Sequence, residues 1–153
     1  MLGKTQEWLA NQAKITPAVV IGLESAKRKL PDNHALSQVK GVLEANGLEL
    51  LEAAEARGEG VRWKEPTNKT WVDCLRHGRA MLGISLDEMA ARSGVGKYAI
   101  ARLERGNQKR LPEQSAERLR DVLFENGVVI LPEDRSHGAG VCMRPKLRQL
   151  PPL

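Results

Sequence analysis

The chain is poor in aromatic residues and in cysteine. Its 153 residues include three Trp, one Tyr, one Phe and two Cys. Cys74 and Cys142 stand far apart, and neither has another Cys or a His at the spacing of a zinc site. We therefore expect no metal site and two structural thiols kept reduced in the cytoplasm.

Long apolar runs are also missing. No stretch approaches the roughly 18–20 apolar residues that a membrane-spanning helix needs. The first residues do not show the basic and then apolar pattern of a secretory signal. The sequence thus predicts a cytoplasmic protein with no membrane partner.

No group of residues suggests catalysis. His34, His77 and His137 are widely spaced, and Cys74, which we expect to be buried, has no positioned base because His77 is expected to be exposed. The segment Gly138-Ala139-Gly140 is too short for a phosphate-binding loop, and its similarity to Gly58-Glu59-Gly60 favours a hairpin turn. We expect no enzyme activity, no cofactor and no small-molecule ligand.

Positive charge is what the chain has in excess. The net charge is +5 and the isoelectric point is about 9.5. Residues 1–63 hold eight basic and eight acidic residues, so the entire excess lies in residues 64–153. A basic surface fits a polyanionic partner, and nucleic acid is therefore expected to bind mainly to the second half.

The chain matches itself when it is shifted by 80 residues. The clearest matches are Met1-Leu2-Gly3 with Met81-Leu82-Gly83, Leu23-Glu24 with Leu103-Glu104, Asn46-Gly47 with Asn126-Gly127, and Gly60-Val61 with Gly140-Val141. Leu30-Pro31 matches Leu111-Pro112 at a shift of 81, which predicts one slipped loop residue. The sequence therefore contains two copies of one unit.

The second copy is complete. Capping residues and glycines predict helices from Thr70 to Leu82, from Ser85 to Ser93, from Lys97 to about Glu104, and from Pro112 to Asn126. A hairpin is expected from residues 128–131 and 141–143. The first copy repeats this order from Thr5 onward, but Met1 matches Met81 near the end of the first helix, so we expect either an upstream start that supplies this helix or another chain that covers the surface.

Two short helices joined by a glycine-containing turn form a geometry that binds DNA. We expect Ile100 and Leu103 to face the core and Lys97, Tyr98 and Arg102 to face outward, where they can contact base edges and phosphates. The neighbouring basic residues that we expect to add phosphate contacts are Arg105, Lys109 and Arg110.

Residues 79–106 read RAMLGISLDEMAARSGVGKYAIARLERG. This stretch resembles the Cro/repressor (XRE-like) helix-turn-helix family of transcription regulators. The resemblance implies two tandem λ-repressor-like domains, a mainly α fold in which each domain is followed by a short β-hairpin. It also implies base reading by Lys97, Tyr98 and Arg102, and a structural ion pair between Arg79 and Glu104.

The two copies depart from the family in different places. The family usually begins its second helix with a phosphate-binding Gln, where the second copy has Leu86 and the first keeps Gln6. The third helix of the first copy has Pro17, Ala18 and Gly22 at the reading positions, and none of these side chains can donate a hydrogen bond to a base.

In the first copy, apolar residues stand at or near the positions where base-contacting side chains are expected. Trp8 matches the expected exposed position of Glu88, and Ala18, Val19 and Ile21 lie on or beside the third helix's outer face. Exposed aromatic and branched side chains are typical of interfaces. The alternative is that Trp8 covers a local core edge.

These observations predict a degenerate domain at 1–63, a linker at 64–69, a DNA-binding domain at 70–144 and a flexible tail at 145–153. The expected function is sequence-specific binding of double-stranded DNA, as a transcription regulator and repressor. The first domain would form a homodimer or bind a protein partner. The alternative function is a protein-interaction module, similar to an antiactivator or antitoxin.

Overall fold

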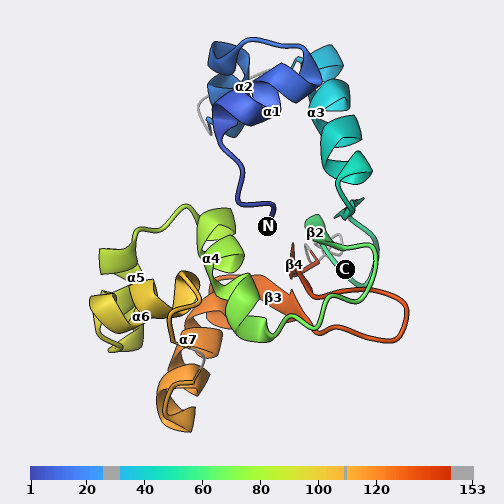
Figure 1. The fold of residues 1–153 in the computed structure, drawn as a ribbon. Coiled ribbons are helices and arrows are strands. Elements are labelled where there is room, and N and C mark those ends of the chain that lie inside the picture. The colour runs from blue at the N-terminus through green and yellow to red at the C-terminus, as the bar shows by residue number, and fades with distance from the viewer. Residues whose placement is uncertain (26–31, 109, 146–153) are drawn as a thin grey trace, which may run out of the picture. The chain divides into compact units, whose positions relative to one another are not determined.

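The computed structural model (Figure 1) describes residues 1–25, 32–108 and 110–145, and within them the protein is mainly α with one small sheet. The helices are α1 Gln6–Ala13, α2 Pro17–Glu24, α3 Asn33–Ala45, α4 Trp71–Leu82, α5 Leu86–Ser93, α6 Lys97–Glu104 and α7 Glu113–Glu125. The strands are β1 Leu48–Leu51, β2 Gly60–Trp63, β3 Val128–Leu131 and β4 Gly140–Met143. Leu30-Pro31, Lys109 and residues 146–153 of the expected tail lie outside the described residues.

The shift of 80 residues recurs in the boundaries of the elements. Both ends of α1, α2, α3, β1 and β2 reappear 80 residues later as the ends of α5, α6, α7, β3 and β4. The one-residue slip expected between the copies does not reach the following helix, since α3 begins at Asn33 and α7 at Glu113. Among the described residues, α4 has no counterpart in the first half.

The same turn leads from helix to strand in both halves. The side-chain amides of Asn46 and Asn126 each donate to the carbonyl oxygen four residues back, at 2.8 and 2.7 Å. Gly47 and Gly127 follow with φ values of 88° and 91°, which glycine adopts without steric cost. The repeated Asn-Gly pair therefore ends a helix and directs the chain into a strand.

The sheet has the strand order β1-β2-β4-β3. Strand β4 pairs antiparallel with β3, where Val129 lies opposite Cys142, and antiparallel with β2, where Val61 lies opposite Val141. The two hairpins expected, one in each copy, are present as the neighbouring strands β1 and β2 and the neighbouring strands β3 and β4. In addition, β2 pairs with β4, so the two hairpins form one sheet, which the sequence did not predict.

The chain divides into two compact units, Met1–Leu50 and Leu51–Leu153. This division differs from the predicted boundary, because β2 pairs with β4 and so belongs to the second unit. The segment expected to be a linker also lies within that unit. In it, the backbone N–H groups of Thr67 and Asn68 donate to the Glu133 carboxylate at 2.6 and 3.1 Å.

The second unit has the larger core. Helices α4 to α7 and strands β3 and β4 contribute to it, and Leu75, Met89, Ile100, Leu119 and Val141 are completely buried. Each such side chain contributes about 1.5–3 kcal/mol relative to an exposed position. This core is the rigid support for α5 and α6.

The first unit has a smaller and less covered core. Its fully buried positions in the helices are mostly occupied by alanine, and the largest of them is Val20. Leu23, Val39 and Leu43 are half-buried, although their counterparts Leu103, Leu119 and Leu123 are buried. The counterparts lie in the unit that contains α4, which packs against α6, α7 and β3.

The second unit also contains two cysteines and one histidine with altered surroundings. Cys74 and Cys142 are buried free thiols, and burial raises the pKa of Cys74 to about 11. His77 is half-buried instead of exposed as expected, and desolvation lowers its pKa to about 4. No helix within the described ranges is long and apolar enough to cross a membrane.

Candidate functional site

Helices α5 and α6 form the frame of the candidate site (Figure 1). They are eight residues each and are joined by Gly94-Val95-Gly96, in which Gly94 has a φ of 69° and Val95 is buried. The left-handed glycine ends α5, and the buried valine anchors the turn to the core. Helix α5 packs against both α6 and α7, and α6 packs against α4, so the pair is attached to the rest of the second unit.

Helix α6 has one buried face and one exposed face. Ile100 and Leu103 are buried in the core, as the sequence predicts. Lys97, Tyr98 and Arg102 are exposed, and 79% of the surface of Tyr98 is accessible. The exposed face therefore presents two cations and a phenol on one rigid helix.

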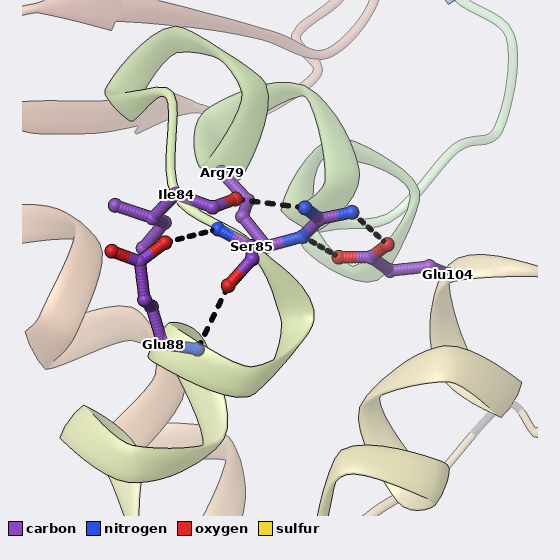
Figure 2. A network of polar contacts seen from close by, with 5 residues as sticks. All are labelled: Arg79, Ile84, Ser85, Glu88 and Glu104. Carbon is purple, nitrogen blue, oxygen red and sulfur yellow. Dashed lines mark hydrogen bonds and ion pairs between the residues drawn. The ribbon is translucent and has the colours of Figure 1, made fainter.

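A bidentate ion pair fixes the end of α6 (Figure 2). The Arg79 guanidinium on α4 donates to the two carboxylate oxygens of Glu104 on α6, from Nε and Nη2, at 2.8 Å each. The two side chains are only 17% and 6% exposed, and the bond to Glu104 raises the pKa of Arg79. The ion pair implied by the family resemblance is present and joins α4 to α6.

The same arginine also reaches the start of α5. Arg79 Nη1 donates to the Ile84 carbonyl oxygen at 2.9 Å, directly before the capping residue Ser85. Ser85 and Glu88 form the predicted capping box, with hydrogen bonds of 2.7 and 3.1 Å, which lowers the pKa of Glu88 (Figure 2). One network thus orients α4, α5 and α6 together.

Lys97 has a partner that the sequence did not indicate. Its Nζ lies 2.7 Å from Asp87 Oδ2 on α5, and this hydrogen bond raises the pKa of Lys97. The two side chains remain 44% and 72% exposed. Asp87 and Lys97 are ten residues apart on different helices, so helical spacing along one helix does not reveal the pair.

Gln108 is a second residue that the sequence did not single out. Its Oε1 accepts from Arg102 Nε at 3.3 Å, and its Nε2 donates to the Arg110 carbonyl oxygen at 2.9 Å. Gln108 therefore connects the exposed face of α6 to the following loop. Arg105 ends α6 and is exposed, as is Arg110. Lys109 was expected here but lies outside the described residues.

The corresponding face of the first unit is apolar. Ile21 is 53% exposed, Ala18 is exposed and Val19 is half-buried. Trp8 is also half-buried, with Lys4 Nζ 5.4 Å from its ring centroid, so the fully exposed position expected for it is wrong. The alternative reading, in which the indole covers a core edge, agrees better with this burial.

Gln6, at the position where the family has its phosphate-binding Gln, makes a contact that the sequence did not predict. Its side-chain amide donates to the Glu24 carboxylate, and Glu24 matches Glu104 of the second unit. A glutamine on α1 thus donates to Glu24, whereas an arginine on α4 donates to the equivalent Glu104. The ends of α2 and α6 are therefore held by different chemistry.

The exposed face of α6 offers hydrogen-bond donors and positive charge. Arg and Lys side chains can donate to phosphate oxygens and to guanine edges, and Tyr can contact phosphate or a thymine methyl group. Within residues 1–25, 32–108 and 110–145, no group of three His, Cys, Asp or Glu side chains is placed to hold a metal ion. The arrangement is suited to binding an anion-rich surface.

Substitution of Glu104 by Gln should destabilise the second unit by about 3–5 kcal/mol, because it leaves the Arg79 guanidinium partly buried without its counter-charge. Chemical denaturation followed by circular dichroism measures this loss. The matched control replaces both partners, Arg79→Met with Glu104→Leu, and should cost much less because no unpaired charge remains. Equal losses in the two variants would contradict the assigned structural role.

Comparison of the chain with family models, with curated proteins and with solved structures found no significant match. The arrangement of α5 and α6 is therefore the physical basis for assigning a function.

Proposed function

We propose that the protein is a sequence-specific DNA-binding transcription regulator built from two tandem λ-repressor-like helix-turn-helix domains. The observation that carries this proposal is the two-sided character of α6, which buries Ile100 and Leu103 and exposes Lys97, Tyr98 and Arg102. A helix of this kind, supported by a second short helix, can enter the major groove and present its side chains to base edges.

The distribution of charge supports the same domain as the DNA-binding one. All of the net charge of +5 comes from residues 64–153, and Arg105 and Arg110 extend the basic surface beyond α6. Contacts of such residues with phosphates position a protein on the duplex and dominate its affinity. Occupation of a promoter by this domain would block transcription sterically, which makes repression the favoured outcome.

Replacement of Lys97 and Arg102 by Ala should abolish selection of a DNA sequence by the full chain. Each lost base contact costs about 1–3 kcal/mol, so enrichment of a motif from a random duplex library should disappear while weak binding at low salt persists. Selection followed by sequencing, and titration of the enriched duplex across a salt series, measure both effects.

The control for this experiment removes the same charge elsewhere. Arg76 and Arg135 are exposed on α4 and on the β3–β4 loop, and their double replacement by Ala should retain motif selection. If the wild type enriches no motif, or if both double variants enrich the same motif as the wild type, α6 does not read sequence.

Replacement of Asp87 by Asn should strengthen binding to DNA of any sequence. The carboxylate holds Lys97 at 2.7 Å and repels phosphates, so its removal frees one cation for the backbone. The slope of log affinity against log salt should become steeper by about one counterion. Asp121→Asn, an exposed carboxylate on α7, is the matched control. Weaker binding by Asp87→Asn would mean that Asp87 positions Lys97 for contact.

A second candidate function, binding of a protein partner, is favoured by the apolar outer face of α2. Ile21 and Ala18 are exposed there, and Pro17, Ala18 and Gly22 leave that face without donors for base edges. Exposed apolar side chains that gather on one face mark sites of protein interaction. The first unit would then recruit a partner while the second binds DNA.

A photo-crosslinking amino acid in place of Ile21 should give a discrete product with one other protein in the native host cell. The same group at Glu117, an exposed position on α7, is the control and should not give that product. Crosslinking yield is read on a denaturing gel and the product is identified by mass spectrometry. Identical patterns at the two positions would contradict a partner surface on α2.

A further inference from the structure

Strands β2 and β4 occupy equivalent positions in the two repeats, and they pair directly with each other. Val61 and Val141, which are equivalent at a shift of 80, lie opposite one another. On one side of them Gly60 faces Cys142, and on the other side Arg62 faces Gly140. The first residue of each strand, Gly60 or Gly140, therefore lies opposite the third residue of the other strand. The pairing is symmetric about Val61 and Val141.

The backbone hydrogen bonds beside the strands follow the same symmetry. Gly58 N–H donates to the Met143 carbonyl oxygen at 2.8 Å, and Gly138 N–H donates to the Trp63 carbonyl oxygen at 3.0 Å. In return, Met143 N–H donates to the Glu59 carbonyl oxygen at 2.8 Å, and Trp63 N–H donates to the Ala139 carbonyl oxygen at 3.2 Å. Gly58 and Glu59 thus lie opposite the single residue Met143, and Gly138 and Ala139 lie opposite Trp63. Two residues opposite one is the pattern of a β-bulge, and it occurs once at each end of the pairing.

Four glycines at equivalent positions permit this close approach. A Cβ atom on Gly60 would lie 2.7 Å from the Cys142 Cα, and one on Gly140 would lie 2.7 Å from the Arg62 Cα. Cβ atoms on Gly58 and Gly138 would lie 2.8 and 2.5 Å from the Cβ atoms of Met143 and Trp63. Contacts of this length with backbone and Cβ atoms exclude any side chain, so the repeated Gly-x-Gly is required by strand pairing.

These contacts have the form of an isologous interface, in which the same surface meets itself across a two-fold axis. We infer that the β2–β4 pairing is a two-fold dimer interface contained within one chain. The occupant of the β4 edge is β2 of the same molecule, and when β2 cannot pair, β4 of a second copy offers a strand with the same glycine spacing. This inference is independent of DNA binding.

The burial of β4 shows why its edge needs an occupant. Val141 and the preceding Ala139 are buried in the core of the second unit, and Cys142 is buried as well, so β4 cannot leave that core to satisfy its backbone in water. Without β2, its outer N–H and C=O groups would form an open edge. Such an edge pairs readily with another strand of matching register.

Replacement of Gly60 by Val tests the inference in the full chain. The new side chain expels β2 but leaves Gly138 and Gly140 on β4 unchanged, so two copies should pair through their β4 strands. Sedimentation should show a concentration-dependent doubling of mass relative to the wild type. Gly96→Ala, at a glycine with no atom within 4 Å of a Cβ, is the control and should sediment as the wild type does.

A peptide of residues 57–65 makes the test specific for β4. In excess, the native peptide should return the Gly60→Val variant to the mass of the wild type, and the peptide with Val at position 60 should not. If the variant is unfolded, the native peptide should restore its circular dichroism spectrum and the Val peptide should not. A folded variant that keeps the wild-type mass, or a variant that responds equally to both peptides or to neither, overturns the inference.

Discussion

The close approach of β2 to β4 is the constraint on which the second unit depends. Strand β4 is buried on the core side by Val141, and Cys142 is buried as well, so its remaining backbone groups must be paired along the sheet. Only glycines at 60 and 140 allow the strands to come this close. A strand from the first half of the sequence is consequently part of the compact unit formed by the second half, and the division of the chain falls before β2.

A second constraint orients the proposed DNA-binding surface. The Arg79–Glu104 pair joins α4 to the end of α6, and the third donor of Arg79 reaches the carbonyl oxygen of Ile84, the residue before the α5 cap. With both ends of the α5–α6 pair held, the exposed face of α6 presents its long side chains from a fixed backbone. Asp87 and Gln108 limit where Lys97 and Arg102 point in the free protein.

The two repeats keep the same element boundaries but differ in what they expose and how they are held. In the first unit Gln6 bonds the carboxylate that corresponds to Glu104, and the core positions that match Leu103, Leu119 and Leu123 are only half-buried. Lys14 adopts a φ of 55° where its counterpart Gly94 has 69°, a conformation that costs a non-glycine residue about 1–2 kcal/mol. The first unit is thus less well supported, while its α2 face is apolar, consistent with a different role.

Local chemistry in the sequence determined much of this protein. Capping residues, the Asn-Gly turns and the apolar spacing of α6 act over a few residues, so they predict the helices, the repeat and the exposure of Lys97, Tyr98 and Arg102. The Arg79–Glu104 pair came from the family resemblance. Only the tertiary structure decided that Trp8 and His77 are half-buried, that Asp87 meets Lys97, and that β2 pairs with β4. Those outcomes depend on contacts between distant residues and on backbone hydrogen bonds, which any residue type can make. The repeated Gly-x-Gly was visible as a pattern, but its reason, the space denied to a Cβ by the opposite strand, exists only in the folded chain.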